Sequence, residues 1–188
     1  FACQAPKIGS FLQKAWEHVG SLYTIDIGLS DFASNIALIE MEDGAFCLAP
    51  LERTTHKYRR GTVHLIAGSK EMMGAASLAA QAALTSGAGY VRSYIPNDAH
   101  EASLLLPLEA VRAFYNPLEP SFLSRMDKGA LIIGPGLGKS EQTERLIEVL
   151  LERNSLPLVL DGDGLGSLAP KCLTSQYLKN AILTPHRK

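Results

Sequence analysis

The sequence has few cysteines, almost no net charge and no long apolar run, and each absence excludes a class of protein. Its three cysteines, Cys3, Cys47 and Cys172, form no Cys-x-x-Cys pair, so neither a zinc site nor a disulfide framework is expected. With 18 basic and 19 acidic residues the net charge is −1, which gives no reason to expect nucleic acid or an anionic membrane as a partner. No apolar run reaches the roughly 18 residues that a membrane span requires.

The start of the chain also lacks two signals. It begins Phe1-Ala2-Cys3-Gln4, without an initiator Met and without the charged n-region of a secretory signal peptide. We therefore expect a cytoplasmic protein and a sequence that begins inside a longer one. Its 188 residues, 46% of them hydrophobic and 20% charged, suffice for one globular domain, with or without a part of another.

Residues 1–50 and the rest of the chain differ in pattern. In the first part we expect one short helix and two strand-like runs, at Phe11 to Trp16, 22–27 and 36–39. A basic, turn-rich stretch follows at 53–61, which we interpret as a domain boundary or an ordered functional loop.

From Thr62 onward, the pattern predicts alternating strands and helices. Strands are expected at 63–67, 91–95, 130–133, 156–160 and 181–184, and helices at 72–87, 98–106 and 140–153. Continuous apolar strands separated by helices are typical of an α/β protein with a parallel sheet covered on both faces. Ligands of such sheets bind at the carboxyl ends of the strands, where turns rich in Gly, Asp and His fall here.

One of these turns, in the stretch LIIGPGLGKS at 131–140, has three glycines directly behind an apolar strand. A glycine-rich turn in this position often holds a phosphate. A Walker A loop does not fit, because Ile133 stands where its first Gly is required. A dinucleotide-binding fingerprint fits Gly134 and Gly136, but Lys139 replaces its third Gly. A tight turn without a ligand remains an alternative when this motif is considered alone.

Other short motifs accompany this turn in a fixed order. They are His56-Lys57 before Gly61, Ala67-Gly68-Ser69 before Gly74-Ala75-Ala76, Gly87-Ala88-Gly89-Tyr90-Val91, Gly134-Pro135-Gly136-Leu137-Gly138, Leu160-Asp161-Gly162-Asp163-Gly164-Leu165 and Leu183-Thr184-Pro185-His186. Together they resemble the ADP- or ATP-dependent NAD(P)HX dehydratases, a metabolite-repair branch of the ribokinase-like fold formerly grouped with carbohydrate kinases. The resemblance implies a ribokinase-like parallel sheet with helices on both faces over residues 51–188, incomplete at its C-terminus.

Residues 1–50 are similar to the closing segment of the NAD(P)HX epimerase domain, which many bacteria fuse ahead of the dehydratase. The similarity rests on FACQAPKIG at 1–9, Val19-Gly20 and Ile25-Asp26-Ile27-Gly28. It implies a bifunctional repair protein, of which this chain would be an internal part.

The implied reaction removes water from the hydrated nicotinamide ring of NADHX or NADPHX and is coupled to hydrolysis of ADP or ATP. A kinase-type site would phosphorylate the ring hydroxyl, and phosphate would leave as the nicotinamide is restored. ADP or ATP and Mg²⁺ are the implied cofactors. Nucleotide and dinucleotide ligands are the implied partners, and a homo-oligomer is left open.

The resemblance also implies a set of substrate-binding residues: Ala75, Ala76, Gly136, Gly138, Asp161, Asp163 and His186. Glycines suit close approach of the backbone to a ligand, because a Cβ would block it. The two aspartates can orient a ribose or a magnesium-bound water, or can cap the turn after their strand. Candidates for phosphate or nucleotide contact are His56, Lys57 and Ser69, with an exposed basic loop as the alternative for the first two.

The chain departs from the family pattern at two places. Gly166 stands where the family usually has Asn, and Arg187-Lys188 follow His186 where the family usually continues Pro-Gly-Glu. The family's nucleotide-binding Lys-Gly segment and its Gly-x-Gly-Asp motif, which supplies the catalytic carboxylate, would lie beyond Lys188. We therefore expect no catalytic residue, no protein metal site and no dehydratase activity in these residues alone. A small-molecule kinase of the same fold, acting on a sugar or vitamin alcohol, and a non-catalytic nucleotide-binding module remain alternatives.

Overall fold

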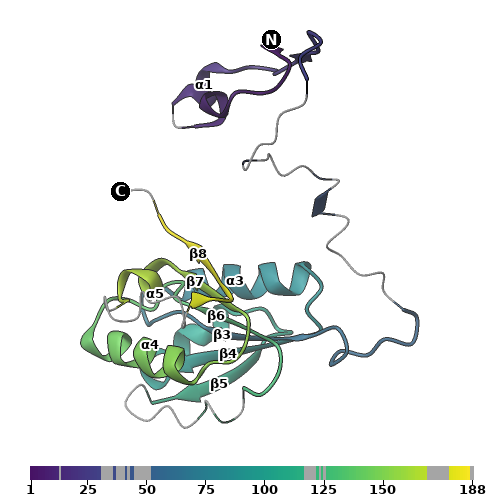
Figure 1. Cartoon of the computed structure of the whole chain (residues 1–188). Helices are drawn as coiled ribbons and strands as arrows, with labels where there is room; N and C mark the ends of the chain where they lie inside the picture. Colours follow the sequence, from purple (N-terminus) through teal and green to yellow (C-terminus); the bar gives the residue numbers. More distant parts are fainter. Residues whose placement is uncertain are drawn as a thin grey trace. The chain divides into compact units, whose positions relative to one another are not determined.

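The computed structural model describes residues 1–12, 14–30, 36, 41, 43–44, 52–116, 122, 124, 126–168 and 178–186. The chain divides into two compact units, Phe1–Pro50 and Leu51–Lys188 (Figure 1). Among the described residues, no helix has the length and apolar character needed to cross a membrane.

The elements in the described residues of the first unit are all short. They are β1 (Ala2–Cys3), the 3-10 helix η1 (Ile8–Phe11), α1 (Ala15–His18) and β2 (Thr24–Ile25), with β1 and β2 paired in parallel. The side-chain oxygen of Gln4 accepts hydrogen bonds from the amides of Ile27 (3.0 Å) and Leu29 (3.3 Å), which holds the chain after β2 against the end of β1. The predicted helix at Phe11 to Trp16 is thus wrong in its bounds, and the strand expected at 22–27 is reduced to two residues. The strand expected at 36–39 lies outside the described residues except for Ile36.

The second unit is built on a six-stranded sheet in which every neighbouring pair is parallel. Its strands are β3 (Thr62–Ile66), β4 (Tyr90–Pro96), β5 (Val111–Tyr115), β6 (Ala130–Ile133), β7 (Leu158–Asp161) and β8 (Ala181–Thr184), in the order β5-β4-β3-β6-β7-β8. The chain therefore enters the sheet at β3, runs outward to β5, and returns to the other side of β3 with β6. This change of direction between β3 and β6 is the point at which ligands bind in open parallel sheets.

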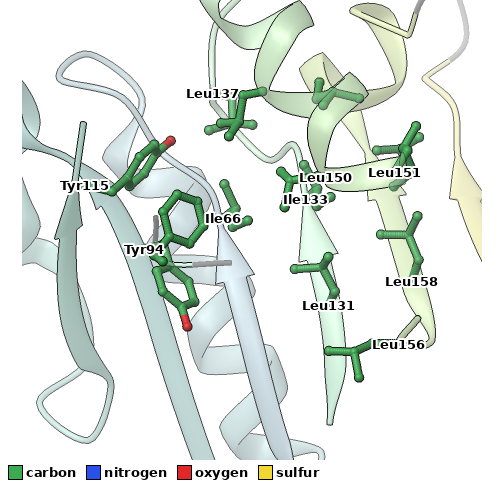
Figure 2. Packing of buried hydrophobic residues seen from close by; sticks show 14 residues of the cluster. Ile66, Tyr94, Tyr115, Leu131, Ile133, Leu137, Leu150, Leu151, Leu156 and Leu158 are labelled. Atoms are coloured by element: carbon green, nitrogen blue, oxygen red, sulfur yellow. The ribbon is translucent and has the colours of Figure 1, made fainter. Parts of the chain in front are cut away.

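Two helices, α3 (Met73–Thr85) and α4 (Glu141–Arg153), cover opposite faces of this sheet. Consecutive residues of a strand point to opposite faces. Leu65 packs in one core cluster with Met73 of α3, whereas the next residue, Ile66, packs in a second cluster with Ile147 and Leu150 of α4 (Figure 2). The predicted parallel sheet with helices on both faces is confirmed.

Both helices begin and end near the predicted bounds, for local reasons. The Ser140 hydroxyl caps α4 by accepting a hydrogen bond from the amide of Thr143 at 3.1 Å. At the C-terminal end of α3, Gly87 has a φ of +102°, a conformation that terminates helices and that glycine adopts without strain.

The segment after β4 differs from its prediction. Instead of one helix over 98–106, it forms two short 3-10 helices, η2 (Asn97–Ala99) and η3 (Glu101–Leu105). The Ser103 hydroxyl donates a hydrogen bond to the carbonyl of His100 at 2.5 Å, and Pro107 forces Leu106 into an extended conformation. These two local preferences compete with a regular α-helix and prevent it.

The structure contains two elements that the sequence pattern did not predict, the strand β5 and the helix α5 (Gly162–Gly166). The edge strand β5 has the sequence VRAFY, which is short and lacks strict alternation of apolar and polar residues. The stretch after β7, expected to be a turn, is the single helical turn of α5.

Candidate functional site

A cleft of about 850 Å³ lies at the carboxyl edge of the sheet, and we name it the large cleft. Its walls come from the start of α3, the turn after β6, the segment from the end of β7 through α5, and the residues that follow β8. Five of the predicted substrate-binding residues line it, namely Ala75, Gly136, Asp161, Asp163 and His186. Residues from four separate segments of the chain are thereby brought into one site.

The floor of the large cleft is the glycine turn after β6, which hydrogen bonds fix to the end of β3. The amide of Gly134 donates to the carbonyl of Ile66 at 3.1 Å, and the amide of Gly68 donates to the carbonyl of Pro135 at 2.8 Å. Gly136 has a φ of +66°, and a Cβ there would lie 2.6 Å from the carbonyl oxygen of Met72. A side chain at this position would thus clash within the protein before it reached a ligand.

The two predicted aspartates also hold the walls of the cleft together. Asp163 accepts a hydrogen bond from the amide of Gly138 at 3.0 Å, which ties α5 to the glycine turn. Asp161 accepts one from the hydroxyl of Thr184 at 2.5 Å, which ties β7 to the end of β8. One oxygen of each carboxylate is therefore engaged in the architecture of the cleft.

Two predicted residues lie behind the cleft rather than on its surface. Ala76 is 1% exposed and packs in the core, where the Cβ position of Gly68 lies only 2.9 Å from its methyl group. Gly138 does not line the cleft, and its amide is already bonded to Asp163. These residues support the wall that Ala75 and Gly136 present.

Lys139 is a lining residue that the sequence pattern did not single out. A Cβ at Gly166 would lie 2.9 Å from Cε and 3.1 Å from Nζ of Lys139. The lysine side chain thus occupies the space beside Gly166, where the family usually has an Asn. The departure from the family pattern at residue 166 was the available signal, but the sequence alone does not show which side chain uses the space.

The three predicted phosphate or nucleotide candidates lie elsewhere. Ser69 lines a second cleft of about 160 Å³, which we name the small cleft. The Nζ of Lys57 lies 5.8 Å from the ring centroid of Tyr90, which is the first residue of β4. Lys57 is therefore at the amino edge of the sheet, opposite the large cleft. His56 contacts the neighbouring Tyr58 at the same end, with ring centroids 6.4 Å apart.

The buried histidine of β3, His64, is the middle residue of its strand and does not line the large cleft. Its Nε2 donates to the carbonyl of Lys128 (3.0 Å), which leaves Nδ1 to accept from the Tyr94 hydroxyl (3.2 Å). Burial lowers the pKa of His64 below its ordinary value of 6.5, so the neutral ring is favoured. We interpret His64 as a packing residue.

The sequence of the chain is similar to that of known proteins. Residues 63–188 match the family model described as NAD(P)H-hydrate dehydratase. The chain is 30% identical to the bifunctional NAD(P)H-hydrate repair enzyme Nnr of Thermanaerovibrio acidaminovorans, over 97% of this chain and 39% of that protein. The chain thus spans about two fifths of the length of that curated relative.

Two solved structures share the fold of the second unit. A ribokinase-like superfamily protein from Enterococcus faecalis has a TM-score of 0.64 at 23% identity, covering 73% of this chain and 49% of that one. The ADP/ATP-dependent NAD(P)H-hydrate dehydratase from Bacillus subtilis, co-crystallised with ATP and Mg²⁺, has a TM-score of 0.57 at 27% identity, covering 71% and 48%. The ribokinase-like fold expected from the sequence is confirmed.

Proposed function

The chain belongs to the NAD(P)H-hydrate dehydratase family, and we propose that its large cleft binds the hydrated dinucleotide NADHX or NADPHX for ADP- or ATP-dependent dehydration. One observation carries the proposal: Ala75, Gly136 and His186, which the family resemblance assigns to the substrate, line one cleft at the switch point of the sheet. The cleft volume of about 850 Å³ lies within the range of small-molecule and cofactor sites.

Lys139 supplies the charge that a dinucleotide requires. It is the one lysine or arginine on the described lining of the large cleft, and no described residue forms an ion pair with it. α3 begins at the same cleft, so the positive end of its dipole adds to the field of the ammonium group. We assign Lys139 to the pyrophosphate of the substrate.

Asp161 and Asp163 can orient a water molecule bound to Mg²⁺. Among the described residues no three His, Cys, Asp or Glu side chains gather as a metal site. One or two carboxylates fit an ion that binds mainly to nucleotide phosphates and water, as Mg²⁺ does in phosphoryl-transfer enzymes. Bound ADP or ATP supplies the phosphoryl group that turns the ring hydroxyl of the substrate into a leaving group. His186 lies on the β8 side of the cleft, and we assign it to the nicotinamide end of the substrate.

We also propose that Phe1–Pro50 is the end of an epimerase domain and that the protein acts in the cytoplasm. The name of the Thermanaerovibrio acidaminovorans relative, a bifunctional repair enzyme matched over 97% of this chain, supports the first of these statements.

A substitution that fills the large cleft without disturbing the fold tests the proposed site. Gly74 is an exposed residue of α3 that lines the cleft, and a Cβ there has no atom within 4 Å. Gly74→Met projects a side chain into the cleft and improves helix propensity by about 1 kcal/mol. We expect titration calorimetry to show NADPHX binding at least about tenfold weaker, a loss of about 1.4 kcal/mol.

The matched control is Gln81→Met, which places the same side chain on the exposed part of α3 outside the cleft. It should leave the affinity unchanged. Equal affinities in Gly74→Met and the parent chain would refute the assignment of the large cleft. Phosphorylation of a sugar or vitamin alcohol by a protein that does not bind NADPHX would instead favour the small-molecule kinase.

A further inference from the structure

The small cleft lies where β4 and β5 end and α4 begins. Its volume is about 160 Å³, and none of its lining residues lines the large cleft. Its polar lining consists of Ser69, Asp98, Tyr115, Ser140, Gln142 and Thr143. The large cleft and its proposed substrate do not explain why these groups gather here.

Tyr115, the last residue of β5, is the most informative of them. It is only 5% exposed, and its ring packs against Phe122 with centroids 4.8 Å apart. Its hydroxyl lies on the side of Leu137, another lining residue of the small cleft (Figure 2). Within the described part of the chain this hydroxyl has no hydrogen-bond partner. Tyr115 lines the small cleft, so its hydroxyl is available to a ligand or to water there.

The state of this hydroxyl is also defined. Burial, reinforced by the negative charge of Asp98, raises the pKa of Tyr115 above its ordinary value of 10. The hydroxyl therefore keeps its proton at neutral pH. It can donate a hydrogen bond to a ligand, whereas the carboxylate of Asp98 can only accept.

α4 begins at the small cleft with the positive end of its dipole, but the charged side chains around the cleft disfavour an anion. Asp98 is the only charged residue on its described lining, and the first turn of α4 adds Glu141 and Glu144. The Ser140 hydroxyl already caps the helix by accepting from the amide of Thr143. A phosphate would thus meet negative charge without a lysine, arginine or histidine to balance it, while hydroxyl groups would find both donors and acceptors.

The size and the apolar lining of the small cleft further restrict the class of ligand that it can bind. The cleft volume of about 160 Å³ is far larger than a single water molecule needs and is of the size of one five- or six-membered ring. Pro96, Leu137 and Leu146 complete the lining and can pack against the carbon atoms of such a ring.

We propose that the small cleft binds the hydroxyl groups of a sugar ring, such as a ribosyl group, with Tyr115 donating to one hydroxyl and Asp98 accepting from a neighbouring one. The inference does not depend on the substrate of the large cleft. The ring belongs either to a free sugar or to a ribose of a dinucleotide, and both sources present the same vicinal hydroxyls.

The test is a titration of the ¹⁵N-labelled chain with D-ribose, followed by amide chemical shifts. We expect the amides of Ser69, Gln142 and Thr143 to shift in a saturable manner, while those of Gly136 and His186 stay in place. Inorganic phosphate is the comparison probe. Shifts of the small-cleft amides with phosphate but not with D-ribose would overturn the proposal, as would no response to either probe.

Tyr115→Phe isolates the hydroxyl. Because this group has no partner among the described residues, its removal should leave Tm within about 2 °C of the parent. D-ribose binding should weaken at least about fivefold, the effect of one lost hydrogen bond. The control is Tyr58→Phe, at an exposed tyrosine outside both clefts. Unchanged D-ribose binding in Tyr115→Phe would refute the assigned role.

NADPH then distinguishes the two sources of the ring. If the ring comes from a dinucleotide, NADPH shifts the amides of both clefts at one midpoint, and D-ribose competes only at the small cleft. If the ring comes from a separate sugar, NADPH shifts only the large-cleft amides, and D-ribose binds with the same affinity in its presence. Both results support the proposal and identify the ligand.

Discussion

The two faces of the sheet are packed by side chains of different size. On the α4 face, leucines, isoleucines and aromatic rings fill the space between helix and sheet, among them Leu150 and Tyr94 (Figure 2). On the α3 face the helix contributes Met73, Ala76 and Ala80 to the core. Small side chains allow a helix to approach a sheet closely, and the start of α3 meets the glycine turn at Gly136. Among the described residues, the α4 face holds the larger core cluster, with 14 buried residues against 10, while the α3 face brings the start of a helix to the large cleft.

The largest expected effect concerns stability on the α4 face. Leu150 is 1% exposed, so Leu150→Ala removes a filled core position and should lower the free energy of unfolding by about 2–5 kcal/mol. Leu78 of α3 is 75% exposed, so Leu78→Ala should change the free energy of unfolding by no more than about 0.5 kcal/mol. Urea denaturation of both variants measures the contrast. Similar losses at the two positions would break the comparison between the faces.

The next effect concerns the backbone between the two faces. Gly134 has a φ of +122°, and a Cβ there would lie 1.9 Å from the carbonyl oxygen of Asp161. Gly134→Ala should therefore destabilise the second unit by more than about 2 kcal/mol, since strain and a backbone clash add. Gly61 also has a positive φ, +89°, but an open surrounding, so Gly61→Ala should cost only about 1 kcal/mol. Equal losses would show that conformation alone, without packing, sets the requirement for glycine after β6.

The smallest expected effect concerns the charge of Lys139 in the large cleft. Lys139→Met should weaken NADPHX binding about three- to tenfold at low salt, and the difference should shrink as salt screens the charge. Lys128→Met is the matched control, because Lys128 is exposed and its described hydrogen bond to His64 uses the backbone carbonyl. Calorimetry at two ionic strengths measures both variants. A loss that is independent of salt would indicate that Lys139 acts through packing.

The order of strands and helices was predictable because it rests on local patterns. Apolar runs such as 130–133 and the Ser140 cap with its helix are visible within a few residues. The edge strand β5 was not predictable, because its sequence does not alternate between apolar and polar residues. Its residues are buried by Phe122 and by the neighbouring strand β4. The failed helix at 98–106 shows the same limit, since Ser103 and Pro107 outweigh its apolar periodicity.

For the candidate site, the sequence indicated which motifs end on the carboxyl edge of the sheet but not which of them meet. The resemblance named Ala75 and Ala76 together, and the structure separates them into a lining residue and a core residue. It gave no role to Lys139, whose position depends on the missing side chain of Gly166 across the cleft. Neither distinction has a local signature, because each depends on which neighbour the folded chain brings within a few ångströms.

The pairing of β3 with β6 has a consequence for how the protein folds. These central neighbours are separated in the chain by the whole of α3, β4 and β5, so their contact closes a long loop and carries a large entropic cost. Contacts of this kind form slowly compared with local ones. The glycine turn reaches the end of β3 only when that pairing is made, through the bonds of Gly134 and Gly68. Ligand binding at the large cleft should therefore appear in the same kinetic phase as the pairing of the two central strands, after the helices have formed.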